Sequence, residues 1–214
     1  MSVLIRDVHT HQLPSEVGTA IVSVDAADWQ PVDGQLYAVG LHPWTLSEEW
    51  EQQMEQWQSV LRSDSAGQIV MAGETGLDRL RGASLLVQRK VFEEVVRTAE
   101  ERALPSVIHD VHAMAEVLAV RKALSASMPW LIHGFRGGPE QAAQYLRAGC
   151  HISLGRHYNP TTLLALPSDE LFLESDAHPE DLDALYAEVA ERLGRPVDVL
   201  RGQVNDNITK VLGR

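Results

Sequence analysis

The sequence predicts an α/β protein, a (β/α)8 barrel of the TIM type in which the helix after the second strand is missing or reduced. Eight short apolar or β-branched runs recur along the chain, and most are followed by a helix-like segment or a polar loop. Polar residues follow most of these runs, at the place where barrel enzymes carry their chemistry. An open, doubly wound parallel sheet is the alternative fold.

The apolar runs and the periodic segments between them give the expected elements. The expected strands are Leu4–Val8, Ala20–Val24, Leu36–Leu41, Gln68–Gly73, Ser106–Ile108, Trp130–Ile132, His151–Leu154 and Leu171–Glu174. The expected helices are 47–62, 84–102, 113–125, 139–148, 179–193 and 197–212. Ser47 and Ser84 are expected N-caps, and Gly194 suits a left-handed C-terminal cap. Asp25–Gln35 is too short for a full crossover helix.

Composition narrows the function classes. The length of 214 residues favours a single domain, 1–214. Eighteen Lys and Arg against thirty Asp and Glu give a net charge of −12, which argues against coating duplex nucleic acid but leaves room for a local basic cleft. Because Cys150 is the one cysteine, no internal disulfide forms and a reducing compartment is expected. Since no apolar run is long enough to span a bilayer, we expect a cytoplasmic protein without a membrane partner.

Ligand-type side chains gather at the ends of five predicted strands. His9 and His11 are two residues apart, so a strand directs both rings to one side. Glu74 and Asp176 each end an apolar strand, where an unpaired carboxylate is costly and a metal ion removes the cost. His109 and His133 each follow an apolar strand. Each residue alone has an ordinary structural explanation, but six together indicate a metal site.

The ligand types point to a class of metal. Imidazole with carboxylate is the chemistry of Zn, Mn or Fe(II), whereas Mg prefers oxygen ligands and retained water. Six side chains are more than one tetrahedral ion needs. We therefore predict two divalent metal ions, with Zn, Mn and Mg left open, one bridging carboxylate, and a metal-bridging hydroxide as the nucleophile.

Motifs spread over the whole chain carry a family resemblance. They are DVHTH at 7–11, GLHPW at 40–44, GETGLD at 73–78, VIH at 107–109, IHGFRGGPEQAAQYLRAGCHISLG at 132–155, ESD at 174–176 and the terminal NDNITKVLG. In these motifs the sequence resembles the TatD family of metal-dependent hydrolases, which are amidohydrolase-like barrels. The resemblance implies a metal-dependent nuclease, commonly a 3′ to 5′ exonuclease on single-stranded DNA.

The resemblance also implies a role for each matching residue. His9, His11 and Asp176 would hold one metal, His109 and His133 the other, and Glu74 would bridge the two. Asp176 and Glu74 are thus the expected catalytic residues, and Asp176 would also take a proton from the attacking water. His42 would lie on the substrate side and bind a phosphate oxygen.

Substrate contacts are expected from arginines near the strand ends. Arg79, Arg136 and Arg156 are predicted to bind phosphate, because the guanidinium group pairs with phosphate through a planar fork. Arg81 also lies within a few residues of a predicted strand end, and Trp44 and Phe135 are candidates for stacking on a base.

Three departures from the family pattern bear on the substrate. Val111 stands where the family has an arginine after the histidine. The first motif lacks the usual acidic residue, and the segment after Asp176 is short. These departures keep two alternative functions open. One is a hydrolase of another ester or amide, such as an aminoacyl ester on tRNA. The other is a TatD-like subunit that is active only in a larger complex, such as a phage-defence assembly.

Overall fold

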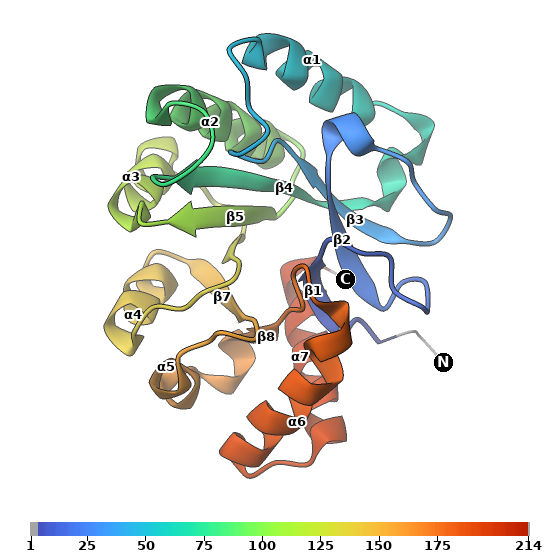
Figure 1. Ribbon diagram of the computed structural model, residues 1–214, viewed down its shortest axis with the longest axis vertical. Helices are drawn as coiled ribbons and strands as arrows, with labels where there is room; N and C mark the ends of the chain where they lie inside the picture. Colours follow the sequence, from blue (N-terminus) through green and yellow to red (C-terminus); the bar gives the residue numbers. More distant parts are fainter. Residues whose placement is uncertain (1–3, 214) are drawn as a thin grey trace. The chain divides into compact units, whose positions relative to one another are not determined.

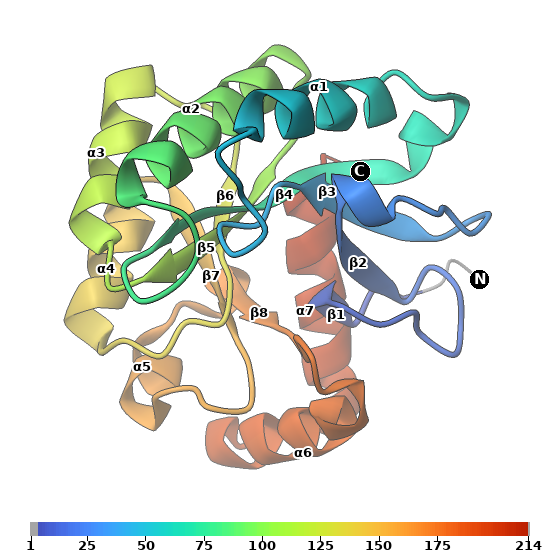
Figure 2. The same ribbon diagram turned by 45° about the horizontal axis from the view of Figure 1, so that its top comes forward.

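The computed structural model describes residues 4–213, which form two compact units. The central unit is Ser23–Leu131. The terminal unit joins the chain up to Val22 to the chain from Ile132 onward. The boundaries between the units fall within strands β2 (Ala20–Asp25) and β6 (Trp130–Ile132), both of which are labelled in Figure 2.

The central unit holds three strands and three helices. The strands are β3 (Leu36–Gly40), β4 (Ile69–Asp78) and β5 (Ser106–Val111), and the helices are α1 (Trp50–Val60), α2 (Leu85–Glu101) and α3 (Met114–Leu124). The strands pair in parallel, and Gly76 lies opposite His109. The helices lie along one side of these strands (Figure 1). Trp57 and Phe92 are fully buried in the core of this unit.

The terminal unit holds both ends of the described chain. Its strands are β1 (Asp7–Thr10), β7 (Cys150–Leu154) and β8 (Leu171–Leu173), and its helices are α4 (Pro139–Arg147), α5 (Pro160–Ala165), α6 (Leu182–Leu193) and α7 (Val197–Val211). β7 and β8 pair in parallel, and a bridge joins Thr10 to Asp176. This bridge makes β1 the neighbour of the segment that follows β8.

The order of the strands follows the chain, from β1 to β8. All eight predicted strands are present. The prediction that the helix after β2 is missing or reduced is confirmed, because a single 3-10 turn, Ala26–Asp28, stands where a crossover helix would be. Such an arrangement places the carboxyl ends of successive strands at one edge of the sheet.

Several predicted boundaries are wrong. β1 begins at Asp7 rather than Leu4, and β4 continues through the GETGLD motif to Asp78, so Glu74 lies within a strand rather than at its end. The helix Pro160–Ala165 was not predicted, since only six residues carry its pattern. Ser47 does not cap α1, which begins at Trp50 after Glu49.

The other two predicted caps are confirmed. The Ser84 side chain accepts a hydrogen bond from the Val87 N–H at 3.4 Å, and Gly194 ends α6 with φ 63°. Within residues 4–213, none of the helices is long and apolar enough to cross a membrane.

Candidate metal centre

In the central unit, one carboxylate oxygen joins two histidines. Glu74 Oε1 lies 2.7 Å from His109 Nδ1 and 3.0 Å from His42 Nε2. Glu74 and His109 are buried, and His42 comes from the turn after β3. The three donor atoms lie within 4.8 Å of one another, a spacing that one cation can span. The sequence indicated His42 as a substrate contact, whereas the structure places it among the candidate ligands.

Glycines bring the three strands of this cluster close together. A Cβ on Gly40 would lie 2.4 Å from Gly73 Cα, and one on Gly76 would lie 2.1 Å from the carbonyl oxygen of His109. Gly76 also has φ 144°, a conformation that side chains disfavour. The close approach that glycine permits sets the distances between Glu74 and the two histidines.

Asp78 is a second carboxylate on His109. Its Oδ2 lies 3.3 Å from His109 Nε2 and accepts a hydrogen bond of 2.6 Å from Trp44 Nε1. Burial raises the pKa of this carboxyl, but hydrogen bonds from Trp44, Leu80 and His109 outweigh burial and lower it. Both ring nitrogens of His109 therefore face carboxylates, which fixes the orientation of the ring.

In the terminal unit, Asp176 lies beside two histidines. Its Oδ1 is 3.5 Å from His11 Nε2 and 3.9 Å from His9 Nε2. The Asp176 N–H donates to the carbonyl of His9, and the His11 N–H donates to the carbonyl of Asp176, both at 3.0 Å. His9 is fully buried, whereas the side chains of His11 and Asp176 are each 40% exposed. The backbone bridge between β1 and the segment after β8 thus holds the carboxylate against the HxH pair.

Glu174 and His133 lie next to this group. His133 Nδ1 is 3.5 Å from Glu174 Oε1, and the rings of His133 and His9 are 4.3 Å apart. The Ser153 hydroxyl donates to Glu174 Oε2. Burial raises the pKa of Glu174, but the hydrogen bond and charge of His133 and the charge of His9 outweigh it, so that the pKa falls. Glu174 is therefore a charged acceptor among imidazoles.

A third carboxyl, Asp7, supports the backbone of this group. It accepts hydrogen bonds from the Ser175 N–H at 3.1 Å and from the His9 N–H at 3.3 Å. Burial raises the pKa of Asp7 to about 7, against the hydrogen bonds of Ser175 and His9, which lower it.

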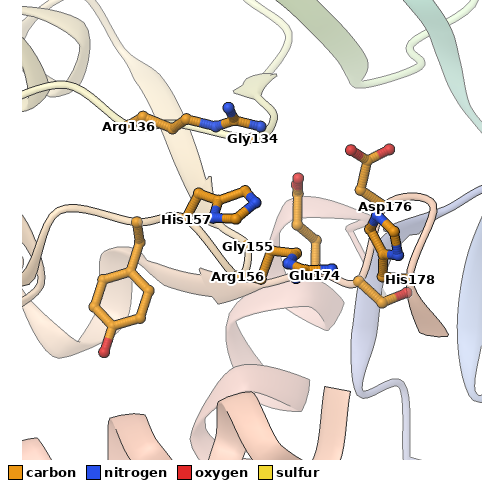
Figure 3. A pocket seen from close by; sticks show the side chains of 10 residues that line it. Gly134, Arg136, Gly155, Arg156, His157, Glu174, Asp176 and His178 are labelled. Atoms are coloured by element: carbon orange, nitrogen blue, oxygen red, sulfur yellow. The ribbon is translucent and has the colours of Figure 1, made fainter. Parts of the chain in front are cut away.

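A pocket of about 110 Å³ opens beside Asp176 in the terminal unit. The carboxylates of Glu174 and Asp176 project into it, and Arg136 and His157 reach toward them from the segments after β6 and β7 (Figure 3). Arg156 lines the same pocket and forms an ion pair of 2.9 Å with Asp181. Arginine and histidine side chains thus line the pocket beside the exposed carboxylate of Asp176, and the guanidinium groups are donors that suit an anionic ligand.

The structure divides the residues selected from the sequence between the two units. The terminal unit brings together His9, His11, His133 and Asp176, with Arg136 and Arg156 on the adjoining pocket. The central unit brings together His42, Glu74 and His109. Arg79 forms an ion pair with Glu116 of α3. The shared metal of His109 and His133 and the bridging role of Glu74 remain predictions.

Sequence reasoning missed three buried carboxylates, Asp7, Asp78 and Glu174. Each stands in a motif that was already identified: Asp78 ends β4, Glu174 directly follows β8, and Asp7 begins β1. The criterion that selected Glu74 and Asp176, a carboxylate at the end of a buried strand, applies equally to Asp78 and Glu174.

Both clusters suit a divalent metal ion by the chemistry of their donors. Each offers two imidazole nitrogens and a carboxylate, which is the ligand set of zinc and manganese. A buried carboxylate such as Glu74 loses its hydration, and a bound cation would offset that cost.

Comparisons with known proteins agree with this chemistry. The family model described as TatD related DNase matches residues 29–213. The "Uncharacterized metal-dependent hydrolase YjjV" of Escherichia coli is 29% identical in an alignment 202 residues long, which covers 87% of this chain and 76% of the relative. The "3'-5' ssDNA/RNA exonuclease TatD" of Cronobacter sakazakii is 29% identical in an alignment 163 residues long, which covers 70% of this chain and 61% of the relative.

A solved structure shows the same fold. The crystal structure of YjjV, a TatD homolog from Escherichia coli, superimposes with a TM-score of 0.80 at 22% identity and covers 98% of this chain and 97% of that one. This likeness confirms the predicted (β/α)8 barrel. Since the family model spans most of the sequence, the chain belongs to the TatD-related DNase family and is a metal-dependent hydrolase.

Proposed function

We propose that the protein is a phosphodiesterase that removes nucleotides from the 3′ end of single-stranded DNA. The observation that carries the proposal is the group formed by His9, His11 and Asp176, which offers three metal donors next to a pocket lined by arginine and histidine. A relative with this activity in its name supports the choice of substrate.

The two clusters would provide ligands for the two proposed ions. His9, His11 and Asp176 would hold one ion, and the family resemblance implies His109 and His133 for the other, with Glu74 shared by both. His42 adds a further donor at Glu74. When bound, such ions polarise a phosphodiester and lower the pKa of a water molecule. Zinc, manganese and magnesium are the candidates.

The protein's own side chains complete the chemistry. Asp176 keeps an exposed carboxylate that can accept a proton from the attacking water, while its backbone is fixed by hydrogen bonds to His9 and His11. Arg136 and Arg156 line the adjoining pocket and provide forked donors for phosphate oxygens. The net charge of −12 over the whole chain favours the end of a single strand over a long duplex.

A nuclease assay tests the proposal. Single-stranded DNA labelled at the 5′ or the 3′ end is incubated with wild type and with Asp176→Asn, and Mg²⁺, Mn²⁺ and Zn²⁺ are tested separately. We expect a ladder from the 5′-labelled strand, release of a labelled mononucleotide from the 3′-labelled strand, and loss of both in Asp176→Asn. Asp183→Asn, which changes an exposed carboxylate of the same unit, serves as the control and should cleave like wild type.

Two results would contradict the proposal. One is equal cleavage by wild type and Asp176→Asn. The other is no cleavage by protein that metal analysis shows to hold two ions. In the second case, a parallel assay on carboxyl esters, including an aminoacyl-tRNA, tests the alternative hydrolase activity.

A further inference from the structure

Trp44 is a half-exposed indole held next to the candidate ligands of the central unit. It keeps 48% of its surface exposed, although Nε1 donates to Asp78 at 2.6 Å. Its ring lies 4.9 Å from that of His42 and 5.6 Å from that of His109. Trp57 of the same unit provides a comparison with a structural tryptophan, because it is fully buried and donates to the Val39 carbonyl at 2.8 Å.

An arginine lies against this indole. The Arg81 guanidinium carbon is 5.0 Å from the centre of the Trp44 ring. Within residues 4–213, Arg81 has no carboxylate partner, whereas Arg79 pairs with Glu116 and Arg89 with Glu93. Arg81 is exposed as well, so the pair offers a flat surface with an uncompensated positive charge.

The loop that carries Arg81 is fixed in place. Asp78 Oδ1 accepts hydrogen bonds from the Leu80 and Arg81 N–H groups at 2.7 and 3.0 Å. The buried Gln88 amide donates to the carbonyl oxygens of Arg81 and Ala83 at 2.9 and 2.8 Å.

The same loop packs against the turn that carries Trp44. A Cβ on Gly82 would lie 2.1 Å from the carbonyl oxygen of Pro43, so only glycine permits this contact. A surface that is already ordered in this way loses little entropy when a ligand binds.

We propose that Trp44 and Arg81 form a stacking site for a nucleobase of the substrate, the base of the nucleotide next to the cleaved phosphodiester. A base stacks on an indole or on a guanidinium plane, and the charge of Arg81 faces the phosphate of the same nucleotide. Contact of Trp44 with His42 and His109 places this surface beside the Glu74 cluster. The inference rests on the proposed function and names the part of the nucleic acid that the central unit binds.

Binding to two oligonucleotides tests the site. In an Asp176→Asn background, which prevents cleavage, fluorescence anisotropy measures the affinity for a labelled thymidine oligomer and for an abasic oligomer of equal length. Because stacking of one base on an aromatic side chain contributes to the binding free energy, Trp44→Ala should weaken binding of the thymidine oligomer by about tenfold. Binding of the abasic oligomer should stay unchanged. Trp44→Phe keeps an aromatic face but loses the bond to Asp78, and it should retain most of the affinity.

Arginine variants separate stacking from general charge. Arg81→Ala should weaken binding of both oligomers, because it removes a phosphate contact as well as part of the stack. Arg89→Ala removes the same charge from an arginine that Glu93 already pairs, and should change neither affinity.

The outcomes distinguish this inference from the proposed function. Equal losses for both oligomers in Trp44→Ala, or no loss for either, would overturn the stacking site while leaving the nuclease intact. A parent protein that binds neither oligomer would overturn the proposed function and the stacking site with it.

Discussion

Ser175 holds Asp7 with two hydrogen bonds, one from its backbone N–H to Oδ1 at 3.1 Å and one from its hydroxyl to Oδ2 at 2.6 Å. Ser175 stands between Glu174 and Asp176, and Asp7 begins β1, which carries His9. The buried pair of Ser175 and Asp7 thus connects the segment that begins with β1 to the segment after β8, and these two segments carry the candidate metal donors His9, His11 and Asp176.

Removing the hydroxyl should destabilise the protein. Ser175→Ala leaves a buried carboxylate oxygen with one donor fewer, which costs about 1 to 3 kcal/mol of unfolding free energy. Urea unfolding measures the loss. Ser63→Ala removes a hydroxyl that bonds only within its own turn, to the Val60 carbonyl, and should cost less. Equal stability of the two variants would show that the Asp7 contact adds nothing.

Metal content should depend on His9. In His9→Ala the ion held with His11 and Asp176 loses a buried imidazole ligand, so we expect one equivalent of bound metal to be lost after dialysis. Elemental analysis by mass spectrometry counts the ions per chain. His151→Ala is the control, since His151 pairs with Glu170 at 2.5 Å and lies outside the cluster. Unchanged metal content in His9→Ala would remove His9 from the ligand set.

Two glycine substitutions should have opposite effects. Gly40→Ala brings a methyl group to 2.4 Å from the Gly73 backbone, and the strain should cost about 3 kcal/mol or more. Gly202→Ala meets nothing within 4 Å in helix α7 and should stabilise the protein by about 0.5 to 1 kcal/mol, because alanine favours helix. Thermal unfolding of both variants checks the prediction. A neutral Gly40→Ala would show that β3 and β4 can move apart.

Acid should weaken one contact of helix α2. The Glu100 carboxylate accepts hydrogen bonds from Ser127 and from the Met128 N–H, at 2.7 to 3.0 Å. Burial raises the pKa of Glu100, but these bonds outweigh it and the pKa is lowered. The stabilisation of the fold by the Glu100 carboxylate is therefore fully present above pH 4.5, the ordinary pKa of a glutamate. It is lost as the pH falls through the lowered pKa of Glu100.

A glutamine variant measures that contribution. Glu100→Gln should lose about 1 kcal/mol of unfolding free energy at neutral pH, and the difference from wild type should shrink in acid. Glu101→Gln changes the neighbouring exposed carboxylate and should show neither effect. A pH-independent difference would assign the loss to packing rather than to charge.

The sequence alone determined the order of the strands and indicated the candidate ligands, because both depend on local pattern. Apolar runs alternating with helical periodicity predict a parallel sheet, and His9, His11, His109 and His133 are recognisable from their places at strand ends. The motifs by themselves indicate the family, because they run in the same order from one end of the chain to the other. The short loop after β2 excluded a crossover helix by its length.

Tertiary structure decided which of these residues meet. His42 joins Glu74 because Gly40 lets β3 approach β4 closely, and no spacing in the chain encodes that contact. Glu174 and Asp78 became part of the clusters through hydrogen bonds to residues distant in sequence, such as Ser153 and Trp44. Local patterns specify which side chains face an edge of the sheet, whereas close approach of backbones and long-range hydrogen bonds set the distances between them.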